Sequence, residues 1–197
     1  MAVFFTSDTH FGHDAVIRSC ERPFTDADEM DEAMIAGWNT AVRPGDTVYH
    51  LGDFCFRNDR GAPWYLERLN GEVHLLEGNH DRHTLRRYAQ HFASVSMIKE
   101  ITIGRQTIVL CHYPMREWNG CYRGAWHLHG HVHGRLNHQP LGHSMDVGVD
   151  SNAFRPWHSD EIVEVLQDRE TPFGDGRPRP VRTTIRAPSP PGNPGTR

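Results

Sequence analysis

The sequence lacks the features that mark membrane-spanning and disulfide-rich proteins. No apolar run approaches the ~20 residues of a transmembrane helix, and the apolar run near the start is too short for the hydrophobic region of a signal peptide. The four cysteines form no C-x-x-C pair, which argues against a thiolate zinc site or a disulfide framework. We therefore expect a cytoplasmic protein with reduced thiols and no membrane partner.

A strong basic excess is also missing. The 21 Lys and Arg are outnumbered by 25 Asp and Glu, giving a formal net charge of -4, whereas non-specific nucleic-acid surfaces usually carry a marked positive excess. A single basic groove stays compatible with this balance. Histidine, by contrast, is abundant, with 15 residues. Its neutral imidazole is a common metal ligand, and its protonated form is a general acid near neutral pH.

The chain is expected to form one folded domain, residues 1–170, followed by a tail. Its 197 residues fit a single domain with a substantial core. Residues 171–197 are rich in Pro, Gly and Arg and almost devoid of apolar side chains, which predicts a disordered tail. The tail's five arginines could contact an acidic partner, but the composition favours a solvated terminus.

Strand-like apolar runs alternate with helical patterns in the first half. In the helix predicted over Thr25–Asn39, Thr25 and Asp28 resemble a capping box, and one face is predicted to carry Met30, Ala33, Met34, Gly37 and Trp38. Gly104-Arg105 predicts a hairpin, so we expect the second half to be more antiparallel than the first. The other predicted helices are Ala62–Leu69, Arg82–Phe92 and Ser159–Gln167. The predicted strands are Ala2–Thr6, Val48–Leu51, Val73–Leu76, Ile101–Ile103, Thr107–Cys111, His127–His129 and Met145–Val149.

Potential metal ligands follow several of these strands. Alternate residues of a strand point to the same face, so Asp8 with His10, and His131 with His133, are each predicted to present two ligands in one direction. Asp53 follows Gly52, which permits close backbone approach, so Asp53 is the best candidate for a carboxylate that bridges two metals. The candidate ligands are Asp8, His10, Asp53, Asn79, His112, His131 and His133. Such oxygen and imidazole donors suit two divalent ions, Mn in the first place, with Fe, Zn or Ni also acceptable.

Five short blocks contain these residues in a fixed order. They are Asp8-x-His10, Gly52-Asp53, Gly78-Asn79-His80-Asp81, His112 and Gly130-His131-x-His133. Together they resemble the blocks of the calcineurin-like metallophosphoesterases, in the compact bacterial or phage type without a cap domain, over residues 3 to 170. The resemblance implies an α/β fold: a four-layer αββα sandwich of two mixed β-sheets flanked by helices, with a dinuclear metal site at strand ends.

The resemblance also implies a role for each residue in the blocks. His80 resembles the catalytic histidine that is not a ligand, and Asp81 is placed to orient it. The first metal would be bound by Asp8, His10, Asp53 and His133, and the second by Asp53, Asn79, His112 and His131.

Residues outside the blocks receive separate predictions. Arg116 and Asn119 follow a ligand directly and are the candidates for substrate binding, and Trp118 between them could stack against a flat leaving group. Phe54 and Phe56 are expected to cover a core. Structural or supporting roles are favoured for His50, His127, His129, Asp146 and Asp150.

The favoured function is a metal-dependent phosphoesterase acting on a phosphate-ester small molecule or a nucleotide. Phosphodiesters are preferred over monoesters, because only Arg57 and Arg116 stand out as cations able to neutralise a dianionic ester. A non-catalytic, metal-stabilised scaffold for protein interactions and a small DNA or RNA nuclease remain open alternatives. The sequence does not indicate an oligomeric state.

Overall fold

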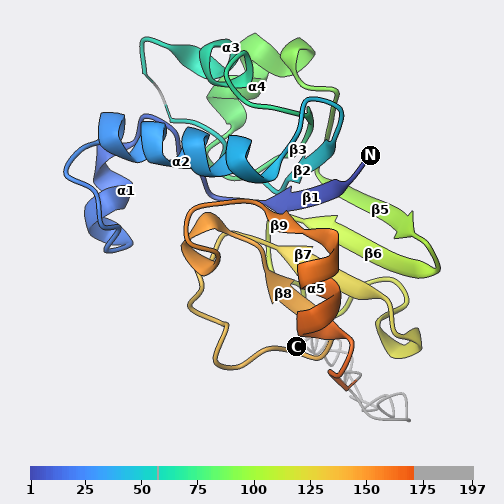
Figure 1. The fold of residues 1–197 in the computed structure, drawn as a ribbon. Coiled ribbons are helices and arrows are strands. Elements are labelled where there is room, and N and C mark those ends of the chain that lie inside the picture. The colour runs from blue at the N-terminus through green and yellow to red at the C-terminus, as the bar shows by residue number, and fades with distance from the viewer. Residues whose placement is uncertain (57, 171–197) are drawn as a thin grey trace, which may run out of the picture.

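Two β-sheets lie face to face in the computed structural model, which describes residues 1–56 and 58–170 (Figure 1). The tail predicted at 171–197 lies outside the described residues. The first sheet has the strand order β4-β3-β2-β1-β9 and the second the order β5-β6-β7-β8. The first sheet comprises β1 (Val3–Thr6), β2 (Thr47–His50), β3 (Glu72–Leu76), β4 (Ser94–Ser96) and β9 (Trp157–His158). The second comprises β5 (Ile98–Ile103), β6 (Gln106–Cys111), β7 (Trp126–His129) and β8 (Ser144–Asp146).

Both sheets are mixed. In the first sheet β1, β2, β3 and β4 are parallel, with Phe4 paired to Val48 and Val48 to Val73, while β9 runs antiparallel to β1. In the second sheet the predicted hairpin joins β5 and β6, but β6, β7 and β8 are parallel. The expectation that the second half is more antiparallel than the first is confirmed, since β1 to β4 are all parallel while the β5–β6 hairpin and β9 are antiparallel. The parallel strands β6, β7 and β8 are joined by long connections that return the chain to the start of each new strand.

Helices cover the outer face of the first sheet (Figure 1). Alternate strand residues point to opposite faces, so Phe4 packs under the helices while Phe5 faces the second sheet. Between the sheets, Leu76 and Leu128 meet Ile162 of the last helix. The helices are α1 (Asp14–Ser19), α2 (Ala27–Ala41), α3 (Gly61–Leu66), α4 (Arg82–Tyr88) and α5 (Ser159–Leu166). Short 3-10 helices span Ala89–His91, Cys121–Arg123 and Val149–Ser151. The predicted arrangement of two mixed sheets flanked by helices is confirmed.

The start of α2 differs from the prediction. Asp26 is the N-cap and accepts a hydrogen bond from the Glu29 backbone N at 2.8 Å, while the Glu29 carboxylate accepts from the Thr25 backbone N at 2.7 Å. The predicted Thr25–Asp28 capping box is wrong. Asp26 has the extended backbone of an N-cap residue, and its carboxylate accepts the hydrogen bond from a backbone N of the first turn. The predicted buried face is confirmed for Met30, Met34 and Trp38 and is wrong for Ala33, which is exposed.

The four cysteines are free thiols, and Cys55, Cys111 and Cys121 are buried packing residues as expected. Within residues 1–56 and 58–170, none of the helices combines the length and the apolar character needed to cross a bilayer.

Candidate metal centre

The predicted ligands lie just beyond the strands, where the backbone turns sharply. β1 ends at Thr6 and β7 at His129, so the paired ligands do not alternate along a strand. The prediction that strand alternation makes the paired ligands converge is therefore wrong. Instead, left-handed backbone at these residues turns their side chains toward one another. Such backbone costs about 1–3 kcal/mol at a non-glycine residue and persists where the surroundings enforce it. Among the described residues, eight non-glycine residues have positive φ, and five of these are predicted ligands: Asp8 (58°), His10 (49°), Asp53 (57°), His131 (71°) and His133 (48°).

Glycines allow these turns to approach one another closely. A Cβ on Gly78 would lie 2.3 Å from Asp53 Oδ1, and a Cβ on Gly130 would lie 2.4 Å from Asp8 Oδ2. Neither position has room for a side chain, because both neighbours are buried and fixed. The glycines of the sequence blocks therefore serve the packing of the ligand loops against each other.

One group of donors combines Asp8, His10 and His133, whose ligand atoms lie within 4.8 Å of one another. The His10 and His133 rings stack with centroids 5.4 Å apart. His10 Nε2 is buried, points to within 3.5 Å of Asp53 Oδ2, and has no hydrogen-bond partner among the described residues. Since buried polar atoms are nearly always hydrogen-bonded, this orphaned nitrogen fits a metal ligand.

A second group combines Asp8, Asp53 and His112. His112 Nε2 lies 3.6 Å from Asp53 Oδ2, so this oxygen has an imidazole nitrogen on either side, from His10 and from His112. Asn79 Oδ1 lies 3.0 Å from His112 Nε2 and 2.9 Å from His131 Nδ1. The structure thus brings all seven predicted ligands together, and their oxygen and nitrogen donors fit divalent ions.

Burial and the neighbouring charges disfavour the charged forms of the carboxyl and imidazole groups in this cluster. Burial, reinforced by the nearby carboxylates Asp146 and Asp53, raises the pKa of Asp8 to about 8. Burial, together with the charges of His133 and Arg22, lowers the pKa of His10 far below its usual range. Divalent ions at this site would favour the ionised carboxylate and the neutral imidazole, the forms in which both groups are ligands.

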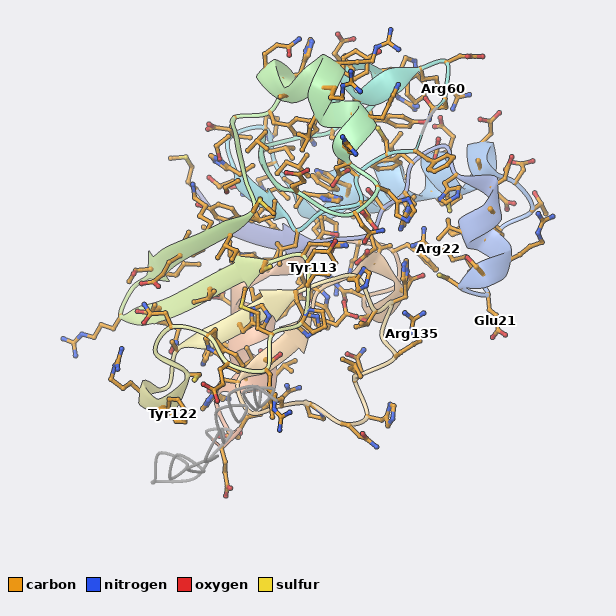
Figure 2. All side chains as sticks on the ribbon, turned by 180° about the vertical axis from the view of Figure 1, so that it is seen from behind. Glu21, Arg22, Arg60, Tyr113, Tyr122 and Arg135 are labelled. Carbon is orange, nitrogen blue, oxygen red and sulfur yellow. The ribbon has the colours of Figure 1, made fainter. Side chains whose placement is uncertain are left out.

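Asp150 and Arg22 hold His133 from behind. His133 Nδ1 lies 2.7 Å from Asp150 Oδ2, and this hydrogen bond, with the Asp8 charge, outweighs burial and raises the pKa of His133. Arg22 donates to both oxygens of Asp150 at 2.8 Å and to the Asp8 carbonyl at 2.6 Å. The supporting role predicted for Asp150 is confirmed. Arg22 lies outside the sequence blocks and was not predicted; Figure 2 shows it in this region, on the segment after α1.

Asp146 supports the same loop from the neighbouring strand. Its carboxylate accepts from the backbone N atoms of Gly134 and Gly148, each at 2.7 Å. These bonds hold the turn after His133 in place, so the supporting role predicted for Asp146 is confirmed as well.

His80 lies at the exposed rim of the cluster. Its backbone N donates to Asp53 Oδ1 at 2.8 Å, and its ring centroid is 5.3 Å from that of His10. Asp81 was expected to orient this ring, but its carboxylate instead accepts from the backbone N of Asp53, Phe54 and Gly78 at 2.7, 2.9 and 2.9 Å. Burial raises the pKa of Asp81 to about 7, although these amides favour its charged form. Asp81 therefore ties two ligand loops together.

His13 is a second rim histidine, which the sequence analysis did not assign. Its Nδ1 lies 3.4 Å from His10 Nδ1, and its ring stacks on Phe56 with centroids 3.9 Å apart. Phe56 is 37% exposed, whereas Phe54 is fully buried. The prediction that both phenylalanines cover a core is thus confirmed for Phe54 and wrong for Phe56.

The segment after His112 presents different side chains from those expected. Trp118 is buried and donates from Nε1 to the Ala125 carbonyl at 2.8 Å, so the predicted stacking role is wrong. Asn119 donates to Glu100 Oε2 at 2.7 Å, away from the ligand cluster, and Arg116 lines a separate cavity of about 410 Å³. The substrate-binding roles of Arg116 and Asn119 stay predictions. Tyr113 is 43% exposed and packs against His131 with ring centroids 4.8 Å apart.

The three histidines assigned structural roles are buried behind the cluster. His50 Nε2 pairs with Thr9 Oγ1 at 2.9 Å, His127 Nδ1 with the Val109 carbonyl at 3.0 Å, and His129 Nδ1 with the Gly130 carbonyl at 3.1 Å. Burial lowers the pKa of His50 to about 3 and those of His127 and His129 to about 4. Each is a neutral, hydrogen-bonded core residue, as predicted.

Comparisons with known proteins agree with this arrangement. The chain is 32% identical over 174 residues to an uncharacterized protein of Methanocaldococcus jannaschii, covering 84% of this chain and 91% of that protein. It is 28% identical over 200 residues to the Gene 66 protein of Mycobacterium phage D29, covering 85% and 97%. The crystal structure of a protein of unknown function from Aquifex aeolicus is similar with a TM-score of 0.67 and 25% identity, covering 84% of this chain and 99% of that one.

A family model accounts for the ligand blocks themselves. The model of the calcineurin-like phosphoesterase superfamily domain matches residues 1–143, a span that contains all seven candidate ligands and His80. The two mixed sheets, the donors gathered at their strand ends and this match lead to one conclusion. The chain belongs to the calcineurin-like phosphoesterase superfamily.

Proposed function

We propose that the protein is a metal-dependent phosphoesterase with a dinuclear site. Asp8, His10, Asp53 and His133 would hold one ion, and Asp53, Asn79, His112 and His131 the other. The observation that carries the proposal is the position of Asp53 Oδ2, 3.5 Å from His10 Nε2 and 3.6 Å from His112 Nε2, which suits a carboxylate shared by two ions. Mn is favoured, and Fe, Zn or Ni fit the same donors. Two bound ions supply a hydroxide nucleophile and neutralise charge on the phosphoryl oxygens.

His80 is the proposed general acid. Its side chain lies at the solvent-facing rim, and its backbone N is anchored to Asp53 Oδ1 at 2.8 Å. This anchor keeps the imidazole beside the ligand cluster without making it a ligand. From there a protonated His80 can give its proton to the oxygen of the departing group, which accelerates the cleavage of poor leaving groups.

Phosphodiesters are the proposed substrates in preference to monoesters. Arg22 bonds to the backbone carbonyl of the candidate ligand Asp8, but it is buried and fully used by Asp150 and by the Asp8 and Thr9 carbonyls. It is therefore not available to a second charge on the substrate. A diester carries a single negative charge, which the two metal ions can balance.

The test is hydrolysis by the metal-reconstituted protein. We expect manganese-dependent release of nitrophenol from bis(p-nitrophenyl) phosphate, faster than from p-nitrophenyl phosphate and abolished in Asp53→Asn. Asp160→Asn, at a highly exposed site on α5, is the matched control and should behave as the wild type. Faster monoester hydrolysis would reverse the preference. Fewer than one bound metal per chain with no ester hydrolysis would instead favour a non-catalytic scaffold.

A further inference from the structure

A basic surface lies on α4, directly after the catalytic candidate His80. Residues 82–99 contain no Asp or Glu, although the chain as a whole is acidic. Arg82, His83, Arg86 and Arg87 line a shared hollow of about 590 Å³, which we call the α4 patch. The expectation that only Arg57 and Arg116 stand out as cations is wrong, because one short helix, α4, carries three further arginines that line this hollow. Arg57 lies outside the described residues.

The arginines of the α4 patch are available to a ligand. Other arginines are held by carboxylates: Arg22 by Asp150, Arg60 by Asp28, Arg68 by Glu32 and Arg155 by Glu161. Within residues 1–56 and 58–170, no comparable ion pair involves Arg82, Arg86 or Arg87. Their positive charge is therefore not cancelled by a neighbouring acid.

The α4 patch begins at the metal centre and extends away from it. Arg82 follows His80 by two residues, and Thr84 of the same helix contacts Cys55 in the loop after Asp53, with 3.4 Å between Thr84 Oγ1 and Cys55 Sγ. A helix rises ~1.5 Å per residue, so Arg86 and Arg87 lie roughly 6 to 8 Å beyond Arg82 along the axis. This is a distance that neighbouring phosphates of an extended strand can span.

Two exposed aromatic rings flank the same centre. Phe56 is 37% exposed, and its ring centroid lies 6.1 Å from that of His80. Tyr113 is 43% exposed and packs against the candidate ligands His112 and His131 at 4.9 and 4.8 Å. Figure 2 shows Tyr113 near the middle of the molecule, below α4. Exposed rings beside a phosphate site can serve as platforms on which bases stack.

We propose that the substrate is single-stranded nucleic acid. This rests on the proposed function, because the scissile phosphate would lie at the metal centre, with flanking phosphates on the α4 patch and bases on Phe56 and Tyr113. Basic tracks combined with aromatic platforms bind single strands, whereas the stacked bases of a duplex do not offer their faces. A water oxygen bonds to phosphorus, the bond to the sugar oxygen breaks, and that oxygen takes a proton from His80. The products are one phosphomonoester end and one hydroxyl end.

Binding of a fluorescent twelve-nucleotide thymidine strand tests the α4 patch. The metal-loaded His80→Ala protein is used, so that cleavage does not obscure affinity. Adding Arg86→Gln and Arg87→Gln should weaken binding about tenfold, and should reduce the slope of log affinity against log salt by about 1.4, since each contact with a single strand contributes ~0.7. Arg105→Gln with Arg123→Gln is the matched control and should change neither value. An unchanged affinity and slope in the α4 double variant would overturn the proposal.

Stacking is tested separately from charge. Phe56→Ala should weaken binding about tenfold, within the range for loss of one stacked base, and Phe56→Trp should restore it. A duplex of the same length and inorganic polyphosphate of matched charge should each compete at least tenfold more weakly than the single strand. Equal competition by either would overturn the assignment to single-stranded nucleic acid.

The outcomes also separate this inference from the proposed function. Metal-dependent hydrolysis of bis(p-nitrophenyl) phosphate without binding or cleavage of the oligonucleotide would overturn the nucleic-acid assignment and leave the phosphoesterase intact. Oligonucleotide binding through the α4 patch with no hydrolysis of any phosphate ester would overturn both, since the substrate assignment requires the chemistry.

Discussion

Two clusters of buried polar side chains in the molecule are built differently. In the first cluster, the fully buried Asp31 of α2 accepts hydrogen bonds from the Gly12 backbone N and the Tyr65 hydroxyl, both at 2.9 Å. The Arg60 guanidinium lies 3.5 Å from the same carboxylate. At the strand ends, carboxylates and imidazoles face each other, and His10 Nε2 has no partner among the described residues. The first cluster is complete in itself. The second leaves a buried donor atom unsatisfied, as a metal site would.

The backbone shows the same contrast. Asp31 lies inside a regular helix, whereas Asp8, His10 and Asp53 have left-handed backbone. A structural polar group can be satisfied by the fold around it at no cost in conformation. Strained residues with unsatisfied side chains occur where the fold has been shaped for a ligand. The contrast therefore separates supporting polar groups from functional ones, and four experiments test it.

The largest expected effect is on catalysis. His80→Ala should lower kcat for bis(p-nitrophenyl) phosphate by about 10²- to 10⁴-fold, the usual contribution of a general acid. Metal content should stay at the wild-type value, because the ring is at the rim and only the backbone N contacts Asp53. Elemental analysis alongside steady-state kinetics checks both points. Unchanged turnover with full metal occupancy would remove His80 from the mechanism.

Asp150 shares features of both clusters. Its hydrogen bonds are satisfied, as those of Asp31 are, but it also contacts the candidate ligand His133. Asp150→Asn leaves the buried Arg22 with a neutral partner, which should lower the free energy of unfolding by about 3 kcal/mol. It should also weaken metal binding about tenfold, because the hydrogen bond that orients His133 Nδ1 is altered. Chemical denaturation and metal titration measure the two effects. Normal metal affinity in a destabilised variant would assign Asp150 to stability alone.

Metal removal should affect stability through the strand-end cluster only. At a metal concentration 100 times the dissociation constant, binding contributes about 2.7 kcal/mol, or roughly 5 to 10 °C in Tm for a chain of this size. Chelation should lower the Tm of the wild type and of Asp31→Asn by the same amount. Asp53→Asn should show no shift. A smaller shift in Asp31→Asn would mean that the two clusters are coupled.

The residues of the strand-end cluster could be predicted from the sequence, because five short blocks contain them in a fixed order. The seven candidate ligands and His80 were predicted as a set, and every long helix and strand was located. The alternation of side chains along a strand does not explain why Asp8 and His10 lie together, since strand β1 ends before them. Elements of two to six residues, such as β9, β4 and α1, went unassigned because they are too short to show a period.

The rim of the site was less predictable. Trp118 was expected to be accessible to a substrate and is buried, whereas Phe56 was expected to cover a core and is 37% exposed. The exposure of a loop side chain depends on what packs over it and not on residue type. Arg22 lies in no recognisable motif, and its position behind His133 follows only from the path of the chain after α1. Long-range contacts of this kind require the three-dimensional fold.

The smallest effect concerns the satisfied cluster. Burial raises the pKa of Asp31 to about 6, even though its hydrogen bonds and Arg60 favour the charged form. A carboxyl whose pKa is higher in the folded state stabilises the protein below its unfolded pKa, near 4, and this stabilisation is lost as the pH rises through about 6. Between pH 4 and pH 7 the wild type should therefore lose about 2 kcal/mol relative to Asp31→Asn. Urea denaturation of both metal-free proteins across this range measures the difference. Asp46 is the control of opposite sign, since hydrogen bonds from the Ala2 and Arg43 backbone N atoms lower its pKa: the stability that it contributes relative to Asp46→Asn should hold from pH 7 down to about pH 4 and should be lost below it. Equal pH dependence of Asp31→Asn and the wild type would show that Asp31 is already ionised in the fold at pH 4, and that its cluster is more fully satisfied than its burial implies.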